Sequence, residues 1–296
     1  MADHPAVVLH IGAHKTASTH LQQAIRAERR ALLAAGVGFF GPPHFRSGRF
    51  PFREAMAWRG ELARLRRRHA PGLVGRHARM QRLVLSEENI LGGAHDPDMF
   101  EQGRFYPRAA QRLARFIAAA GADEVTLFLA VRDPASFLLS AYSQKLLSGR
   151  PMPFDSFIGA LDPARLSWAE LMARLLAVPQ VAGCVLWRFE DYPAIAPRVL
   201  DAMLPPAGAA QVPLPAQPAH QGLSARAHKE VMDWLRAGDR GDAAKVARRA
   251  RTRFAKSPTE PGFAPFGAAT LAATAQAYAR DLDAVAAMAR VTWLRA

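Results

Sequence analysis

Short apolar runs recur along the chain with the length of buried strands. Four of them are clear: residues 6–11 (AVVLHI), 82–86 (RLVLS), 124–131 (EVTLFLAV) and 183–189 (GCVLWRF). Such near-continuous hydrophobic runs are typical of parallel strands covered on both faces, rather than of half-exposed antiparallel strands. The hydrophobic pattern therefore predicts a central parallel sheet.

Longer segments with a helical pattern separate these runs. They cover residues 17–36, 107–121 and 134–149, and each ends on a glycine at the position of a helix C-cap. Two of them have proline in the first turn, where proline is favoured. Alternating strands and helices predict an α/β protein, a three-layer sandwich with right-handed crossovers, followed by a mainly helical C-terminal part.

Two stretches rich in proline and glycine, residues 38–60 and 204–222, interrupt this pattern. We expect them to be loops that cover a site or link to the helical C-terminal third. We expect the whole chain, residues 1–296, to form one domain, because its length suffices for a sizeable core. No run approaches the roughly 18 apolar residues of a membrane helix, and the N-terminus lacks a leader pattern. A soluble cytoplasmic protein is the resulting expectation.

The composition adds a strong positive charge to this picture. The chain has 39 Lys and Arg against 25 Asp and Glu, a formal net charge of +14. This charge suits an anionic ligand, an acidic polymer or a nucleic acid, although solvated helix faces explain it as well. Cys184, the one cysteine, lies in an apolar run, which excludes an intrachain disulfide and predicts a buried thiol. Redox chemistry therefore has no support.

Residues 10–20 (HIGAHKTASTH) join the first predicted strand to the first predicted helix. At such a turn, with Gly12 at the strand end, backbone N–H groups and the helix N-terminus can hold a phosphate. Lys15 would add a positive charge, and Thr16, Ser18 and Thr19 would add hydroxyl donors. Residues of this kind are also favoured simply as helix caps. The segment predicts a phosphate cradle or, alternatively, a capped helix start.

The spacing in this segment differs from the common nucleotide motifs. A Walker A motif has glycine directly before its lysine and another five residues earlier, where this chain has His14 and Leu9. The pattern GxGxxG is absent as well. An ATPase, a GTPase and a dinucleotide oxidoreductase are therefore disfavoured.

A second segment, residues 127–146 (LFLAVRDPASFLLSAYSQKL), places Arg132 at the C-terminal end of a predicted strand. Ser140 follows two turns into the next predicted helix. Ligands of open parallel sheets bind outside the C-terminal strand ends, so Arg132 and the Lys15 loop are expected to face one ligand. A guanidinium and a hydroxyl suit a second phosphate, although the segment alone also fits a capped helix start with a surface arginine.

Together the two segments resemble the sulfotransferases that use 3′-phosphoadenosine 5′-phosphosulfate (PAPS). Residues 11–22 (IGAHKTASTHLQ) are similar to the family's 5′-phosphosulfate loop, and residues 131–143 (VRDPASFLLSAYS) to its 3′-phosphate segment. The chain departs at Ala17 and Ser18, where the family commonly has glycine and threonine. Residues 83–91, 185–193 and 220–232 extend the likeness, which is to the bacterial and heparan-type members.

The resemblance implies a P-loop-like α/β fold and transfer of a sulfuryl group from PAPS to a hydroxyl or amine of an acceptor, a carbohydrate being one candidate. The product 3′-phosphoadenosine 5′-phosphate (PAP) would leave with its 5′-phosphate neutralised by Lys15, without a metal. No nucleic-acid partner is expected. The implied donor site consists of Gly12, Ala13, Lys15, Thr16, Ala17, Ser18, Thr19, Arg132 and Ser140.

The resemblance also places Glu88 at the position of the family's catalytic glutamate. A free glutamate is a weak base, so this role requires burial or a neighbour that raises its pKa. Glu87 competes for the assignment. His14, inside the loop, is the rival base, and His44 and His95 are weaker rivals.

Aromatic residues gather in the predicted loop 38–60, where they would either stack on a sugar or adenine ring or pack the loop down. They are Phe39, Phe40, Phe45, Phe50, Phe52 and Trp58.

Two other classes of protein stay open. A P-loop kinase or phosphotransferase would use a carboxylate such as Glu88 or Asp133 to bind Mg²⁺, and a non-enzymatic binder of anionic polymers would use the basic helices.

Overall fold

The computed structural model describes residues 4–93, 99–101, 103–210, 212–214, 222–238 and 241–296. The chain forms two compact units. The first consists of Met1–Arg132, Ser167–Gln217 and Asp281–Ala296, and the second of Asp133–Leu166 and Pro218–Arg280. The expectation of one domain stays a prediction, because compact units of one chain can fold together.

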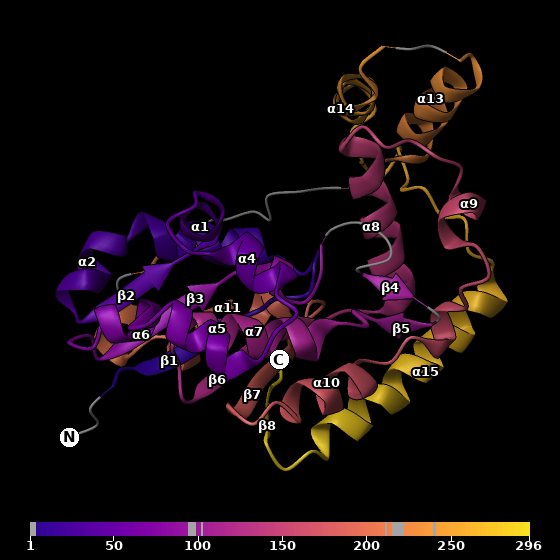
Figure 1. Ribbon diagram of the computed structural model, residues 1–296. Coiled ribbons are helices and arrows are strands. Elements are labelled where there is room, and N and C mark those ends of the chain that lie inside the picture. The colour runs from indigo at the N-terminus through magenta and orange to yellow at the C-terminus, as the bar shows by residue number, and fades with distance from the viewer. Residues whose placement is uncertain (1–3, 94–98, 102, 211, 215–221, 239–240) are drawn as a thin grey trace. The chain divides into compact units, whose positions relative to one another are not determined.

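A six-stranded parallel sheet forms the centre of the first unit (Figure 1). Its order is β2-β3-β1-β6-β7-β8, with β1 (Ala6–His10), β2 (Val37–Phe40), β3 (Arg82–Ser86), β6 (Val125–Val131), β7 (Val181–Arg188) and β8 (Val291–Leu294). In register, Leu9 of β1 lies between Leu85 of β3 and Leu127 of β6. The four predicted strands are all present and parallel, which confirms the predicted sheet, and the short edge strands β2 and β8 extend it.

Helices cover both faces of this sheet. On one face Val8, Val84 and Phe128 pack with α1 (Ser18–Ala27), α2 (Arg29–Ala34) and α11 (Tyr192–Met203). The intervening Leu9 and Leu127 point to the opposite face and are also fully buried. The other helical layer is built around α7 (Ala109–Ala120), against which pack α4 (Phe52–Ala57), α5 (Leu62–Arg68), α6 (Gly72–Arg76) and α10 (Trp168–Leu176). The predicted three-layer α/β class is confirmed.

The predicted helix ends agree with the backbone. Gly36, Gly121 and Gly149 have φ of 75°, 74° and 80°, the left-handed conformation that glycine adopts after a helix. The predicted helix over 17–36 is two helices, because the chain leaves helical geometry at Glu28 (φ −97°, ψ 17°). Among the described residues, no helix combines the length and apolar character required to cross a bilayer.

The segment 38–60 contains regular structure where the sequence predicts a loop. It completes β2 and contains α3 (Pro42–Arg46) and α4. Phe45 and Phe50 are buried and contact the ring of Phe116 on α7, with centroid distances of 5.3 and 5.1 Å. These apolar contacts hold the segment against the helical layer. In the other predicted loop, 204–222, the structure shows α12 (Pro206–Ala209), whereas residues 211 and 215–221 lie outside the described part.

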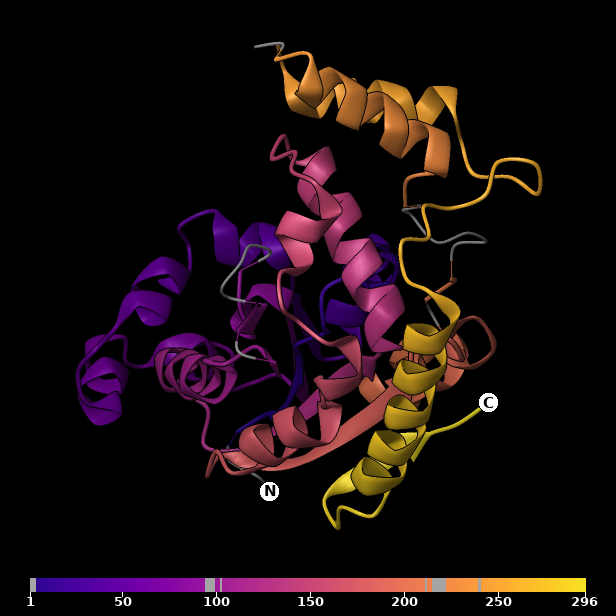
Figure 2. The ribbon, with the colours of Figure 1, turned by 90° about the vertical axis from the view of Figure 1, so that its right-hand side faces the viewer.

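The second unit is helical. It contains α8 (Pro134–Leu147), α9 (Phe154–Ile158), the 3-10 helix η2 (Pro163–Arg165), α13 (Ala225–Arg236) and α14 (Ala243–Arg253), and α13 and α14 lie side by side (Figure 1, Figure 2). Tyr142 on α8 packs against the rings of Phe154 and Phe263, and His228 stacks on Phe263 at 3.7 Å. Burial, aided by the charge of Arg236, lowers the pKa of His228 to about 4, so this half-buried histidine is neutral at neutral pH. Helix α15 (Ala268–Ala286) runs from this unit into the first.

Cys184 lies on β7 and is 2% exposed. Burial raises the pKa of its thiol, which opposes formation of the reactive thiolate. The prediction of a buried thiol is confirmed.

Candidate active site

The loop between β1 and α1 has an unusual backbone. Lys15 has φ of 65° and Ala17 has φ of 64°, whereas Thr16 between them is not in the positive region. Alternation of this kind turns successive backbone N–H groups toward one side and forms a concave anion site. The left-handed conformation costs a residue with a side chain roughly 1–2 kcal/mol, and such strain clusters at functional sites. The loop therefore has the conformation that a phosphate cradle requires.

Two hydroxyl groups of the loop, those of Thr16 and Ser18, differ in their hydrogen bonding. Thr16 donates from Oγ1 to the carbonyl oxygen of Ala13 at 2.6 Å and closes the loop internally. Ser18 begins α1, and its Oγ is buried without a hydrogen-bond partner among the described residues. A buried hydroxyl left unpaired costs about 1–3 kcal/mol, and an anion at the helix N-terminus would satisfy it. Ser18 is therefore suited to donate to a bound phosphate.

Gly12 has no space for a side chain. A Cβ at this position would overlap Oγ of Ser18 and lie 3.0 Å from Nε2 of His10. The absence of a side chain thus allows Ser18 to occupy the inside of the loop.

We expect Gly12→Ala to lower the free energy of unfolding by about 1–3 kcal/mol, the usual cost of overpacking. Urea-induced unfolding measures this change. The matched control is Gly267→Ala, because a Cβ at Gly267 would meet open space. A Gly12→Ala protein as stable as the Gly267→Ala protein would contradict the close packing inside the loop.

Arg132 lies beside the loop. Its Nη1 donates to the carbonyl oxygen of Lys15 at 2.7 Å, and its guanidinium lies 4.3 Å from the ring centroid of Phe189. Its own carbonyl oxygen accepts a hydrogen bond from Nε1 of Trp168 at 2.8 Å. The structure thus brings the end of β6 to the loop after β1, as the sheet topology predicts. Ser140 lies on α8 in the second unit, and its part in binding a phosphate stays a prediction.

The two carboxylates after β3 share one arginine. Arg46 of α3 donates from Nε and Nη2 to the two carboxylate oxygens of Glu87, at 2.9 and 2.6 Å, and Glu87 is fully buried. The same Nη2 lies 2.9 Å from Oε1 of Glu88, whose side chain is 19% exposed. Gln22 of α1 donates to Oε2 of Glu88 at 3.0 Å. Glu87 therefore anchors Arg46, and Glu88 is the carboxylate that solvent reaches.

The pKa values of these groups shift in opposite directions. Burial raises the pKa of Glu87 and outweighs the hydrogen bonds from Arg46. Burial also opposes ionisation of Glu88, but the hydrogen bond from Gln22, its own backbone N–H and the charge of Arg46 together lower the pKa of Glu88. Glu88 is therefore ionised at neutral pH. The sequence analysis expects a general base at this position to have a raised pKa, and the surroundings of Glu88 lower its pKa instead.

His14 is held by hydrogen bonds at three atoms. Its backbone N–H donates to the hydroxyl of Tyr106 at 3.0 Å, its Nδ1 lies 3.0 Å from the same hydroxyl, and its Nε2 lies 3.2 Å from Oδ1 of Asn89. Because that amide oxygen only accepts, Nε2 carries the proton and Nδ1 accepts from Tyr106. Burial lowers the pKa of His14, so it is neutral. Both ring nitrogens are engaged, which favours a structural role for His14 over the predicted role as a base.

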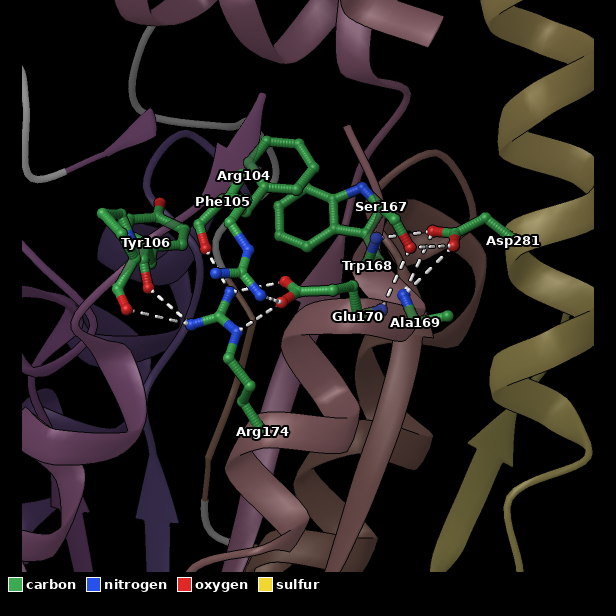
Figure 3. Close-up of polar contacts among 10 residues, drawn as sticks. Arg104, Phe105, Tyr106, Ser167, Trp168, Ala169, Glu170, Arg174 and Asp281 are labelled. Carbon is green, nitrogen blue, oxygen red and sulfur yellow. Dashed lines mark hydrogen bonds and ion pairs between the residues drawn. The ribbon is translucent and has the colours of Figure 1, made fainter. Parts of the chain in front are cut away.

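Tyr106 in turn is held by Arg174 (Figure 3). Arg174 on α10 donates to the carbonyl oxygens of Tyr106 at 2.8 Å and Phe105 at 2.5 Å, and pairs with Glu170. Tyr106 has φ of 44°, so this clamp stabilises a strained backbone. Asp281 accepts hydrogen bonds from Oγ of Ser167 and from the backbone N–H groups of residues 168 and 169, which fixes the start of α10. The support of the loop thus extends from α10 through Tyr106 to His14.

A cavity of about 550 Å³ opens beside Glu88. Thr19 and Gln22 of α1 border it on one side, and β2 and α3 border it on the other. Glu88 is therefore accessible from a space large enough for a small molecule.

Several residues of this site had no signal in the sequence. Arg46 and Tyr106 belong to segments without a motif, and Gln22 ends the segment 11–22 at a position to which the sequence assigns no role. Each meets its partner across more than 40 positions of the chain. His95, a weaker rival base, lies outside the described residues. In the described part of the chain, no group of three or more His, Cys, Asp or Glu side chains could hold a metal ion.

A sulfotransferase from Alicyclobacillus acidocaldarius is similar to this chain among solved structures. The two are 18% identical with a TM-score of 0.38, and the similarity covers 86% of this chain and 97% of that one. No protein-family model matches the chain, and no curated protein matches it. Because a TM-score of this size does not establish a shared fold, we base the proposed function on this chain's own residues.

Proposed function

We propose that this protein is a sulfotransferase that moves a sulfuryl group from PAPS to a hydroxyl or amine of an acceptor. The observation that carries the proposal is the loop after β1. Its alternating backbone around Lys15 suits a phosphate, as does the hydroxyl of Ser18, which has no hydrogen-bond partner within the described ranges. The guanidinium of Arg132 lies against this loop. A donor with a 5′-phosphate and a 3′-phosphate matches a cradle and a separate guanidinium.

The proposed reaction needs alignment and charge stabilisation rather than covalent chemistry by the protein. The acceptor oxygen forms a bond to sulfur, and the bond between sulfur and the 5′-phosphate oxygen breaks. The electron pair of that bond stays on the phosphate of PAP. The backbone N–H groups of the loop, Ser18 and Lys15 stabilise this developing charge.

Glu88 is proposed to take the acceptor's proton. It is ionised, it borders the cavity, and its hydrogen bonds from Gln22 and Arg46 fix its orientation. Glu87 is fully buried against Arg46 and is suited to position that arginine instead. A lowered pKa makes Glu88 a weaker base, so proton transfer must accompany, rather than precede, attack on sulfur.

We expect Glu88→Gln to reduce transfer by about 10²–10⁴-fold while PAP binding stays unchanged, since the amide keeps the shape but cannot accept the proton. Because the pKa of Glu88 is lowered, its carboxylate is fully ionised at any pH above the usual pKa range of glutamate. The wild-type rate should therefore be flat from about pH 5.5 to 7.5 and fall only in more acidic solution. PAP released from PAPS in the presence of a phenol or sugar acceptor measures both. Intact turnover in Glu88→Gln would contradict the assignment.

Calorimetric titration with PAP and, separately, ADP in metal-free buffer tests the proposed donor. We expect PAP to bind more tightly than ADP, and Arg132→Ala to reduce this preference. A preference for ATP with Mg²⁺ would instead identify a phosphotransferase. Absence of any nucleotide binding would favour a binder of anionic polymers, whose affinity would fall steeply with salt.

A further inference from the structure

The cavity beside Glu88 combines apolar walls with guanidinium groups. Its lining includes Phe39, Phe40, Pro42 and Pro43 at the end of β2 and the start of α3, and Arg26, Arg29, Arg46 and Arg49 around them. Glu88 is the single carboxylate among its described lining residues. The cavity is therefore lined by apolar side chains together with an excess of positive charge.

Three of these arginines have no ion-pair partner in the part of the chain that the structure describes. Arg46 is neutralised by Glu87 and Glu88. By contrast, no ion pair or side-chain hydrogen bond joins Arg26, Arg29 or Arg49 to any residue that the structure describes, and all three are exposed. Guanidinium groups bind carboxylates, sulfates and phosphates through paired, charge-assisted hydrogen bonds. Their surplus makes the cavity suited to an anion.

The lowered pKa of His44, which lines the cavity, reflects burial and the same positive charges. Burial lowers its pKa first, and the charges of Arg49, His77, Arg29 and Arg76 lower it further. Its Nε2 is buried and has no hydrogen-bond partner among the described residues. A neutral imidazole beside several cations agrees with the excess of positive charge around the cavity.

The sheet order separates this cavity from the donor side of the site. Strand β3 lies between β2 and β1, and β6 lies on the far side of β1. Residues from the end of β2 border the cavity, whereas Arg132 follows β6 and contacts the loop after β1. Glu88 follows β3, the strand between β2 and β1, and lines the cavity. In the strand order, the end of β2 and Arg132 thus lie on opposite sides of β1.

We infer that this cavity holds the acceptor, and that the acceptor is a small hydroxyl compound with a ring and an acidic group. The inference rests on the proposed function, because it assigns the acceptor of that same reaction. The ring packs against Phe40 and Pro43, and the acidic group pairs with Arg29 and Arg49. The hydroxyl is left to meet Glu88, which takes its proton as the new bond to sulfur forms.

Two matched pairs of probes test this inference. One pair is 4-hydroxyphenylacetate and 4-hydroxyphenylacetamide, and the other is methyl glucuronide and methyl glucoside. Each is titrated calorimetrically into the protein loaded with PAP and into the free protein. We expect the acid of at least one pair to bind about tenfold more tightly than its neutral partner. The pair that shows the preference distinguishes an aryl acceptor from a sugar.

The double variant Arg29→Ala/Arg49→Ala should abolish the preference for the acid and leave PAP binding intact. Arg30→Ala is the matched control, because Arg30 is an exposed neighbour that does not line the cavity. All three side chains are exposed, so their truncation spares the core. Transfer from PAPS to the preferred acid should fall in the double variant and persist in the control.

The outcomes separate the two proposals. Acid and neutral probes that bind within twofold of each other in both pairs, with PAP bound normally, would overturn the acidic acceptor and spare the sulfotransferase. An acid preference that survives in the double variant would overturn the role of Arg29 and Arg49. Absence of PAP binding would overturn the proposed function. If a protein that does not bind PAP still prefers the acid probes, the cavity is an anion site and not the acceptor site of a sulfotransferase.

Discussion

Replacing Lys15 by methionine is expected to reduce sulfuryl transfer by about 10²–10³-fold, the loss typical of removing one group that stabilises charge in the transition state. In the proposed reaction, the departing 5′-phosphate gains negative charge as its bond to sulfur breaks, so the ammonium group would stabilise the transition state more than the bound donor. Turnover should therefore fall more than the affinity for PAP. Methionine keeps the unbranched stem, and the backbone strain at φ 65° is the same for both residues.

Lys15→Arg is the matched control for the loss of positive charge in Lys15→Met, because arginine retains the charge with a different geometry. We expect it to recover part of the lost turnover. Rates are measured as PAP formed from PAPS, and PAP affinity by calorimetry. A Lys15→Met protein that turns over within threefold of wild type would contradict the proposed role of Lys15.

The second large effect concerns stability. Arg46→Met is expected to lower the free energy of unfolding by about 2–3 kcal/mol, because it leaves the fully buried carboxylate of Glu87 without its partner. This is less than the 3–5 kcal/mol typical of a wholly buried pair, since the Arg46 side chain is 47% exposed and solvent screens it. Urea-induced unfolding gives the value.

Arg66→Met is the matched control. The Arg66 side chain is 45% exposed, similar to Arg46, but its partner Asp123 is 63% exposed. An exposed pair of this kind contributes only about 0–1 kcal/mol. A loss in Arg46→Met no larger than in Arg66→Met would show that burial of Glu87 does not matter for stability.

The loss in Arg46→Met should also depend on pH. Burial already raises the pKa of Glu87, and removal of Arg46 raises it further. Between the unfolded pKa and this higher folded pKa, the folded state binds more protons, so stability falls as pH rises. The difference from wild type should therefore be smaller near pH 4.5 than at pH 7. The double variant Arg46→Met/Glu87→Gln, which has no charge to bury, should recover most of the loss, and a loss independent of pH would contradict this explanation.

Local sequence patterns were sufficient to predict the central sheet and the ends of several helices. The strand with Leu127 is buried on both faces and therefore appears as a near-continuous apolar run. Gly36 and Gly121 end helices because they adopt a positive φ that other residues avoid. The loop after β1 is contiguous in the chain, so Gly12, Lys15 and Ser18 could be recognised together as a candidate phosphate cradle.

The segment 38–60 shows where this approach fails. Proline and glycine indicated a loop, but Phe45 and Phe50 contact Phe116, more than 60 positions away, and these contacts hold α3 in place. Helix α3 is only five residues long, too short to be stable alone, so tertiary packing decides its existence. No local signal could have predicted it.

What the sequence determined by itself is the α/β sheet, the loop at the end of β1 and the arginine at the end of β6, because hydrophobic periodicity and the rules of parallel sheets place strand ends together. What only the tertiary structure decided is the partner of each polar group. Arg46 pairs with Glu87, Tyr106 supports His14, and three arginines without an ion pair among the described residues line the cavity at Glu88. Hydrophobic patterns specify which residues are buried, but a hydrogen bond between distant segments depends on how the whole chain packs.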